Sequence, residues 1–167
     1  GGGGYNVVTA RFGVSAGGGT EDTAYDGNVV SDEYGVIGGG NENSAGDRDD
    51  DEASACYATV GGGLANLSGA RYATVAGGQG NRVTGAHGAV AGGADNRVYS
   101  TWGTVSGGHD NLAGTEGQTT GSSATVGGGS GNQASGSGAA VGGGLGNLAS
   151  GGGAAVGGGL SNVVAGV

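Results

Sequence analysis

The sequence predicts an all-β fold, a parallel β-solenoid or β-roll of about ten 15-residue turns with two short strands in each turn. Three observations predict it. Asparagine recurs at every fifteenth position over long runs, valine precedes it at a fixed offset, and glycine supplies 48 of the 167 residues. Within one turn, Ala73, Val75 and Gly77 fall on one side of an alternating pattern, and alternation indicates a strand. Collagen is excluded because proline is absent and glycine does not occupy every third position.

The asparagine column gives the number of turns and the domain organisation. From Asn6 to Asn162 the numbering advances by 22, 15, 23, 15, 15, 15, 21, 15 and 15, which is one constant step with three additions. We therefore predict a single glycine-rich solenoid over residues 1–167, with inserted loops near 19–27, 47–54 and 115–120. The predicted ladder of turn residues is Asn6, Asn28, Asn43, Asn66, Asn81, Asn96, Asn111, Asn132, Asn147 and Asn162.

Each turn is expected to hold two strands and two corners. In one turn, Val75 points inward, the following glycine pair turns the chain, and Val83 points inward from the second strand. Asn81 lies between them, where we expect a left-handed or tight-turn residue whose amide bonds to those above and below. The predicted core ladder is Ile37, Val60, Val75, Val90, Val105, Val126, Val141 and Val156. The second inward column holds Val8, Val30, Ala45, Val98, Ala113, Ala134, Ala149 and Val164.

An exposed aromatic stripe is predicted three residues before the core ladder. Its residues are Phe12, Tyr34, Tyr57, Tyr72 and Trp102, with His87 in the same column. Rings one turn apart, about 4.8 Å, can stack, so we expect the stripe to pack between turns or between protomers. Binding of a glycan or a surface is the alternative. In the last turns the column continues as Ser123, Gly138 and Gly153, and these bare turns could nest against another copy.

The acidic residues are concentrated near the beginning of the chain. Eleven of the fourteen fall between Glu21 and Glu52, and the net charge is -9. The densest run, Asp47–Glu52, is typical of a solvated loop. No cofactor is predicted, although Ca²⁺ could use these carboxylates. The run lacks the glycine-containing spacing of known calcium loops and the nonapeptide repeat of calcium-binding solenoids.

Several other functions are disfavoured by composition. No apolar run reaches the roughly 18 to 20 residues that a membrane-spanning helix needs. Five arginines and no lysine, against fourteen acids, exclude a nucleic-acid surface. His87 and His109 lie at different places in their turns, without a Ser or Cys in fixed relation, so we predict no enzyme. Cys56, the one cysteine, is expected to pack beside Tyr57, with an intermolecular bridge as the alternative.

Two C-terminal segments carry a resemblance to a known family. The motif ATVGGG…N.ASG, seen at Ala124–Gly136 and Ala139–Gly151, resembles the head repeats of trimeric autotransporter adhesins, the YadA-like heads. The resemblance covers nearly the whole chain. It implies a left-handed parallel β-roll that trimerises.

Each turn buries little surface, which predicts assembly. Ordering fifteen residues costs on the order of 20 kcal/mol, whereas one valine and two small inward residues return only a few kcal/mol. The deficit predicts lateral partners, in a trimer or in packed sheets of a fibre. Residues 1–8 also read like residues 157–164, so we expect the last turn of one copy to stack on the first turn of the next.

We therefore predict a non-enzymatic, extracellular structural protein of the cell surface that self-assembles into a fibre or filament through its stacked turns. Its predicted partner is itself, as a trimer or an end-to-end polymer, with glycans or a matrix protein as further candidates. The alternative is the head domain of a trimeric autotransporter-type adhesin that binds host or matrix surfaces. A phage fibre and an ice-binding solenoid are minor alternatives, the latter suggested by Thr59, Thr74, Thr104 and Thr125.

Overall fold

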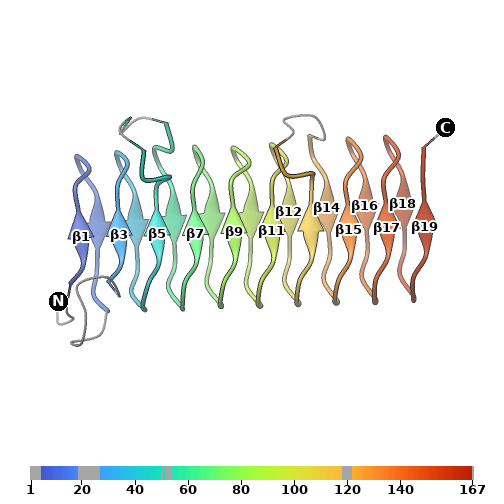
Figure 1. Cartoon of the computed structure of the whole chain (residues 1–167), viewed down its shortest axis with the longest axis horizontal. Coiled ribbons are helices and arrows are strands. Elements are labelled where there is room, and N and C mark those ends of the chain that lie inside the picture. Colours follow the sequence, from blue (N-terminus) through green and yellow to red (C-terminus); the bar gives the residue numbers. More distant parts are fainter. Residues whose placement is uncertain (1–4, 19–26, 50, 52–53, 118–121, 167) are drawn as a thin grey trace.

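The computed structural model is a parallel β-solenoid, which confirms the predicted fold class. It describes residues 5–18, 27–49, 51, 54–117 and 122–166. The coils stack along one axis, and the two termini lie at opposite ends (Figure 1). The described residues form nineteen strands of two residues each and no helix, so this part of the chain contains no segment that could cross a membrane as a helix.

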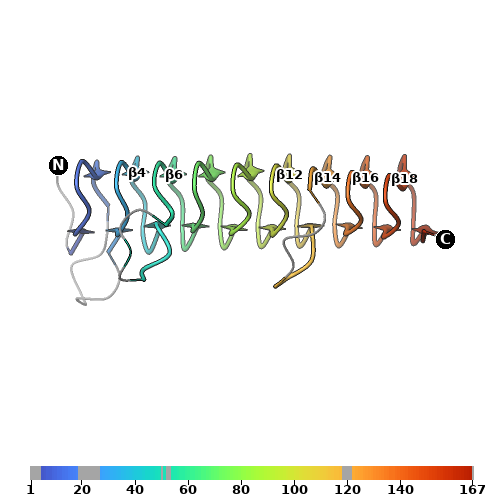
Figure 2. The same ribbon diagram turned by 90° about the horizontal axis from the view of Figure 1, so that it is seen from above.

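The strands form two parallel sheets, which lie on opposite sides of the interior (Figure 2). Sheet A contains β1 (Val7–Val8), β3 (Val29–Val30), β5 (Ser44–Ala45), β7 (Leu67–Ser68), β9 (Arg82–Val83), β11 (Arg97–Val98), β13 (Leu112–Ala113), β15 (Gln133–Ala134), β17 (Leu148–Ala149) and β19 (Val163–Val164). Sheet B contains β2 (Val14–Ser15), β4 (Val36–Ile37), β6 (Thr59–Val60), β8 (Thr74–Val75), β10 (Ala89–Val90), β12 (Thr104–Val105), β14 (Thr125–Val126), β16 (Ala140–Val141) and β18 (Ala155–Val156).

The register pairs each residue with its equivalent in the next turn. Val75 lies opposite Val90, its counterpart one turn later. Val105 pairs with Val126 in the same way, although the segment that joins them is longer than one regular turn. The additional residues therefore leave the ladders at the corners. Because a slip of one residue would turn every inward side chain outward, this constancy keeps the valines inside.

A third ladder, which the two-strand prediction did not include, runs along the glycine corner. It consists of isolated bridges through Asn41, Leu64, Gln79, Ala94, His109, Ser130, Leu145 and Leu160. Two glycines precede each bridge in most turns, as in Gly62 and Gly63, with φ of 150° and 97°. The second of these conformations is one that residues with side chains rarely adopt. Glycine is therefore needed at this position, where the chain turns before the bridge residue.

The core is a narrow column of small side chains between the two sheets. In a typical turn it contains Ala73, Val75 and Val83, none of which is exposed to solvent. All eight residues of the predicted core ladder lie in this column, with exposures of 6% or less. Val8 and Val164, in the first and last turns, are 44% and 38% exposed because each has a neighbouring turn on one side only.

Candidate assembly surfaces

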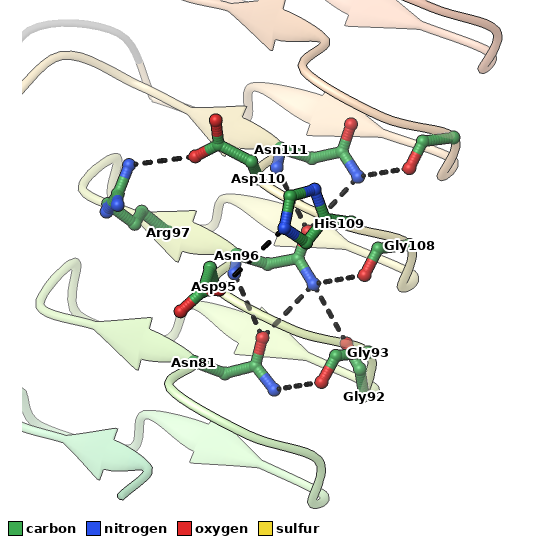
Figure 3. A network of polar contacts seen from close by, with 11 residues as sticks. Asn81, Gly92, Gly93, Asp95, Asn96, Arg97, Gly108, His109, Asp110 and Asn111 are labelled. Carbon is green, nitrogen blue, oxygen red and sulfur yellow. Dashed lines mark hydrogen bonds and ion pairs between the residues drawn. The ribbon is translucent and has the colours of Figure 1, made fainter.

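The ten asparagines lie at the corner that leads from sheet B to sheet A, and eight of them are buried inside the solenoid, whereas Asn6 and Asn162, in the first and last described turns, are half-buried and exposed. The backbone N–H of Asn96 donates to Asn81 Oδ1 at 3.0 Å, and its Nδ2 donates to the same oxygen at 3.1 Å. The Nδ2 also donates to the carbonyls of Gly92 and Gly108, at 3.1 and 3.0 Å (Figure 3). Each amide therefore joins its own glycine corner to the turns on both sides.

The left-handed conformation, one of the two alternatives predicted for these asparagines, is wrong. In nine of the ten turns the left-handed residue is the one before the asparagine: Ala65 has φ of 56°, Gly80 of 64° and Asp95 of 57°, whereas no asparagine of the ladder has positive φ. The asparagine itself continues into the sheet A strand with its side chain inward, where a buried amide must find hydrogen-bond partners. The structure accordingly brings the asparagines together as a ladder inside the corner.

The first and last described turns leave this hydrogen bonding open. Within the stack, each turn donates its sheet A N–H groups to the carbonyls of the following turn, as Leu148 does to Asn162 at 2.8 Å. In the described residues, the N–H groups of Val163 and Ala165 have no acceptor. The carbonyls of Asn6 and Val8 likewise have no donor among the described residues. One end presents donors and the other acceptors.

The predicted aromatic stripe is a continuous stack of six rings. Consecutive ring centroids are 5.0, 4.7, 5.0, 4.9 and 3.9 Å apart, with interplanar angles of 5 to 20°. All six residues have φ between 56 and 64°. This left-handed conformation was not predicted, although the glycines at the equivalent positions of the last two turns point to it. The sequence of the stack is Phe12, Tyr34, Tyr57, Tyr72, His87 and Trp102.

Stacking changes what the stripe offers to a ligand. The interior rings have a neighbour on each face, so they present edges to solvent. Trp102 differs, because His87 covers one face while the next turn has Ser123 in place of a ring, and its side chain is 57% exposed. Phe12, at the other end of the stack, likewise has a ring on one face only and is 71% exposed, so a sugar or another ring would find a free aromatic face at the two ends of the stripe rather than along it.

Polar side chains stabilise the corner that carries the stacked rings, which leads from sheet A to sheet B. The Arg71 guanidinium lies over the ring of Tyr72, 5.4 Å from its centroid. A hydrogen bond with the side chain of Cys56 raises the pKa of Arg71. Cys56 is a free, buried thiol beside Tyr57, as the packing interpretation of the sequence had it. Partial burial, followed by the neighbouring Tyr34 and Tyr72, raises the pKa of Tyr57.

A carboxylate from a neighbouring turn holds the described part of the acidic loop. Asp32 is buried, and its oxygens accept hydrogen bonds from the N–H groups of Asp47 and Ala55 at 3.1 Å. They also accept bonds from the Ser31 and Ser54 hydroxyls at 3.0 and 3.2 Å. The sequence interpretation missed Asp32, which stands outside the acidic run.

Asp32, Asp47 and Asp49 each bring one oxygen within 4.8 Å of the others, as a divalent cation would need. Both oxygens of Asp32 accept protein donors, one from Ser31 beside it and three from residues 47–55. Asp50 and Glu52, which belong to the predicted calcium run, lie outside the described residues. Asp32 therefore stabilises the loop through hydrogen bonds to the protein itself.

Comparison of the sequence with protein-family models finds no match, and comparison with curated proteins finds no relative. The geometry of the described residues therefore carries the functional argument. The resemblance to YadA-like heads stays a prediction about family, while the parallel β-solenoid that it implied is what the structure has.

Proposed function

We propose that this chain is a non-enzymatic structural protein of the cell exterior, whose copies assemble into filaments by stacking turn on turn. The observation that supports it is the complementarity of the two faces of every turn. One face presents N–H groups, and the other presents carbonyls spaced to receive them. A turn of one copy can therefore extend the sheet of another wherever such faces are open.

At the open faces of the described chain, the groups match pair by pair. The N–H groups of Val163 and Ala165 would donate to the carbonyls of Asn6 and Val8 of the next copy. Asn162 Oδ1, which accepts no bond in the described chain, would receive the Asn6 N–H, as Asn147 Oδ1 receives that of Asn162 at 2.9 Å. Sheet A and the asparagine ladder then run through the joint. The last described turn contributes β19 to sheet A but no strand to sheet B. At the joint between two copies, sheet B therefore lacks one strand between β18 of one copy and β2 of the next.

Burial gives the joint its driving force. Val8 and Val164 are 44% and 38% exposed, whereas their equivalents Val30, Val83 and Val98 inside the stack are fully buried. Covering apolar surface contributes about 25 cal/mol per Å², and the paired edge removes unpaired backbone groups. Each turn buries only a few small side chains, so the apolar surface buried at the joint is large relative to what a single turn buries by itself.

The test compares two substitutions at one edge residue. Val163→Pro deletes the N–H that faces the open edge and breaks no described hydrogen bond, whereas Val163→Thr keeps both the N–H and the β-branched shape. We expect the natural chain and Val163→Thr to form filaments by negative-stain electron microscopy and sedimentation, and Val163→Pro to form none. Filaments of Val163→Pro, or a natural chain that never exceeds a dimer at any concentration, would remove the proposal.

A second candidate is the head of a trimeric autotransporter-type adhesin that binds host or matrix surfaces. Described loop residues project from one edge of the solenoid, at Asp47–Asp49 and Gly114–Gly117 (Figure 1), and loops on such edges commonly carry recognition. Its signature would be a discrete trimer by light scattering, together with matrix binding that is lost when the 47–54 loop is shortened. Filaments without trimers would favour the first candidate.

A further inference from the structure

A pocket lies on the outer face of sheet A, beside the loop that follows β5. Figure 2 shows the described part of this loop on the sheet A side of the solenoid. The pocket has a volume of about 350 Å³, at the small end of the range for ligand sites. It is lined by Ser44, Leu67 and Arg82, which are equivalent residues of three consecutive strands, and by Arg48 of the loop. Two guanidinium groups therefore line one small cavity, although the chain has few arginines.

Arg82 lacks the ion pair that its place in the repeat would offer. One turn later, Arg97 Nη1 lies 3.1 Å from Asp110 Oδ1 (Figure 3). Asp95 stands in the equivalent relation to Arg82, but its Oδ2 lies 3.8 Å from His109 Nε2 instead. Among the described residues, the Arg82 guanidinium has no hydrogen-bond or ion-pair partner. Because Arg82 and Arg97 are register partners and like charges side by side are destabilising, an anion bound at Arg82 would stabilise this part of sheet A.

Arg48 is held beside the strands by its own hydrogen bonds. Its backbone has φ of 65°, its N–H donates to Ser31 Oγ at 3.2 Å, and its Nε donates to Ser44 Oγ at 3.1 Å. The two terminal amino groups of Arg48 have no partner among the described residues. Since Ser44 and Arg82 belong to the two strands that flank Leu67, the two arginines of the pocket lie on opposite sides of this leucine.

Glu42 and Asp47 also line the pocket, and they differ in what already binds them. Asp47 Oδ1 accepts a hydrogen bond from the Asp49 N–H at 3.3 Å, and its Oδ2 accepts one from the Ser54 hydroxyl at 3.0 Å. Glu42 is exposed, and its carboxylate has no partner among the described residues. The pocket therefore offers guanidinium donors, a free acceptor at Glu42 and the apolar side chain of Leu67.

These groups specify the chemistry of a ligand. A guanidinium binds a carboxylate through two parallel hydrogen bonds, and a free carboxylate accepts hydrogen bonds from hydroxyl groups. The charges of the two arginines and the two acids in the lining cancel, which favours a ligand with one negative charge over a polyanion. A sugar acid combines one carboxylate with several hydroxyls and an apolar C–H face of its ring.

We propose that the pocket binds a hexuronate residue of an acidic glycan, with the carboxylate between Arg48 and Arg82. The ring then covers Leu67, and its hydroxyls donate to Glu42. The pocket lies on the side of the solenoid, whereas the axial joint of the proposed function lies at its ends. Glycan binding is therefore independent of filament formation, and either can exist without the other.

Saturation-transfer NMR titrations measure this binding, with the Val163→Pro chain so that axial assembly does not contribute. Methyl glucuronide is the probe, and at its size of about 14 non-hydrogen atoms we expect a dissociation constant of about 1 mM. Methyl glucoside, which has the same ring without the carboxylate, should bind at least about tenfold more weakly. Cyclohexanecarboxylate, which has the carboxylate without the hydroxyls, should also bind at least about tenfold more weakly.

Two substitutions on the outer face of sheet A separate the pocket from its surroundings. Arg82→Gln removes one guanidinium and should weaken the binding of methyl glucuronide at least about tenfold. The matched control is Arg97→Gln, one turn away and outside the pocket, which should leave the dissociation constant unchanged within about twofold. Both arginines are exposed, so neither substitution should change the melting temperature appreciably. Undetectable binding up to about 20 mM, equal binding of either comparison ligand, or an Arg82→Gln loss no larger than that of the control would each overturn the proposal. Tighter binding of N-acetylaspartate amide would overturn it in favour of an acidic peptide.

Discussion

Replacing Asn96 by alanine tests whether the buried amide ladder stabilises the solenoid. The Asn96 side chain takes part in five hydrogen bonds, three donated to Asn81, Gly92 and Gly108 and two accepted from Asn111. The substitution leaves the buried N–H of Asn111 and the carbonyl of Gly92 without their described partners. Each such group costs about 1–3 kcal/mol, so with the lost side-chain volume the free energy of unfolding should fall by about 3–5 kcal/mol.

The same substitution at Asn162 is the matched control. Asn162 lies in the last turn and makes two side-chain donations, to Asn147 Oδ1 and the Gly158 carbonyl, while its own Oδ1 accepts none. With both substitutions made in the Val163→Pro chain, so that no joint between copies forms, we expect Asn162→Ala to cost about 1 kcal/mol. Urea unfolding followed by far-ultraviolet circular dichroism measures both, with the slope checked for loss of cooperativity in a repeat protein. Equal losses for the two variants would refute the reasoning, since it rests on the bonds between turns.

Three further predictions follow from buried or stacked groups. Ser100 has a buried hydroxyl without a described partner, and replacing it by alanine should raise the free energy of unfolding by about 1 kcal/mol in urea titration; a loss would contradict the assignment. Asp32→Ala removes the acceptor of the Ala55 N–H, so trypsin should cleave after Arg48 several-fold faster, with Asp110→Ala, at an exposed ion pair, as the control. The raised pKa of Tyr57 means that its neutral form stabilises the fold. That contribution is complete below about pH 10, the ordinary tyrosine value, and is lost as pH rises through the folded pKa. Melting temperature should therefore fall at alkaline pH, and fall less in Tyr57→Phe.

Periodicity made the architecture predictable, because identical turns repeat a weak signal until it is unambiguous. A single turn such as 72–86 contains two strands of two residues each, too short to recognise alone. Ten asparagines and eight core residues in register show both the number of turns and the inward face. The same register placed the rings above one another, which is why their stacking followed from spacing alone.

The features that sequence reasoning missed depend on backbone torsions or on contacts between turns. The left-handed position was assigned to Asn81, whereas Gly80 holds it, one residue away. A repeat position occupied by an aromatic residue in some turns and by glycine in others, such as that of Tyr72 and Gly138, indicates a left-handed backbone conformation, because both residues have positive φ there. Asp32 offered no such signal, because its partners belong to a loop that starts a full turn later and interrupts the repeat.

Because the register is constant, the length of the solenoid can change only by whole turns. Duplicating one repeat unit, for instance 76–90, would keep all three ladders unbroken and lengthen the rod by about 4.8 Å. Removing a single residue from a strand would turn the remaining inward side chains of that strand outward. Such a chain can become longer or shorter by copying or losing a unit of its gene, and its reach from one end to the other can vary while its cross-section stays the same.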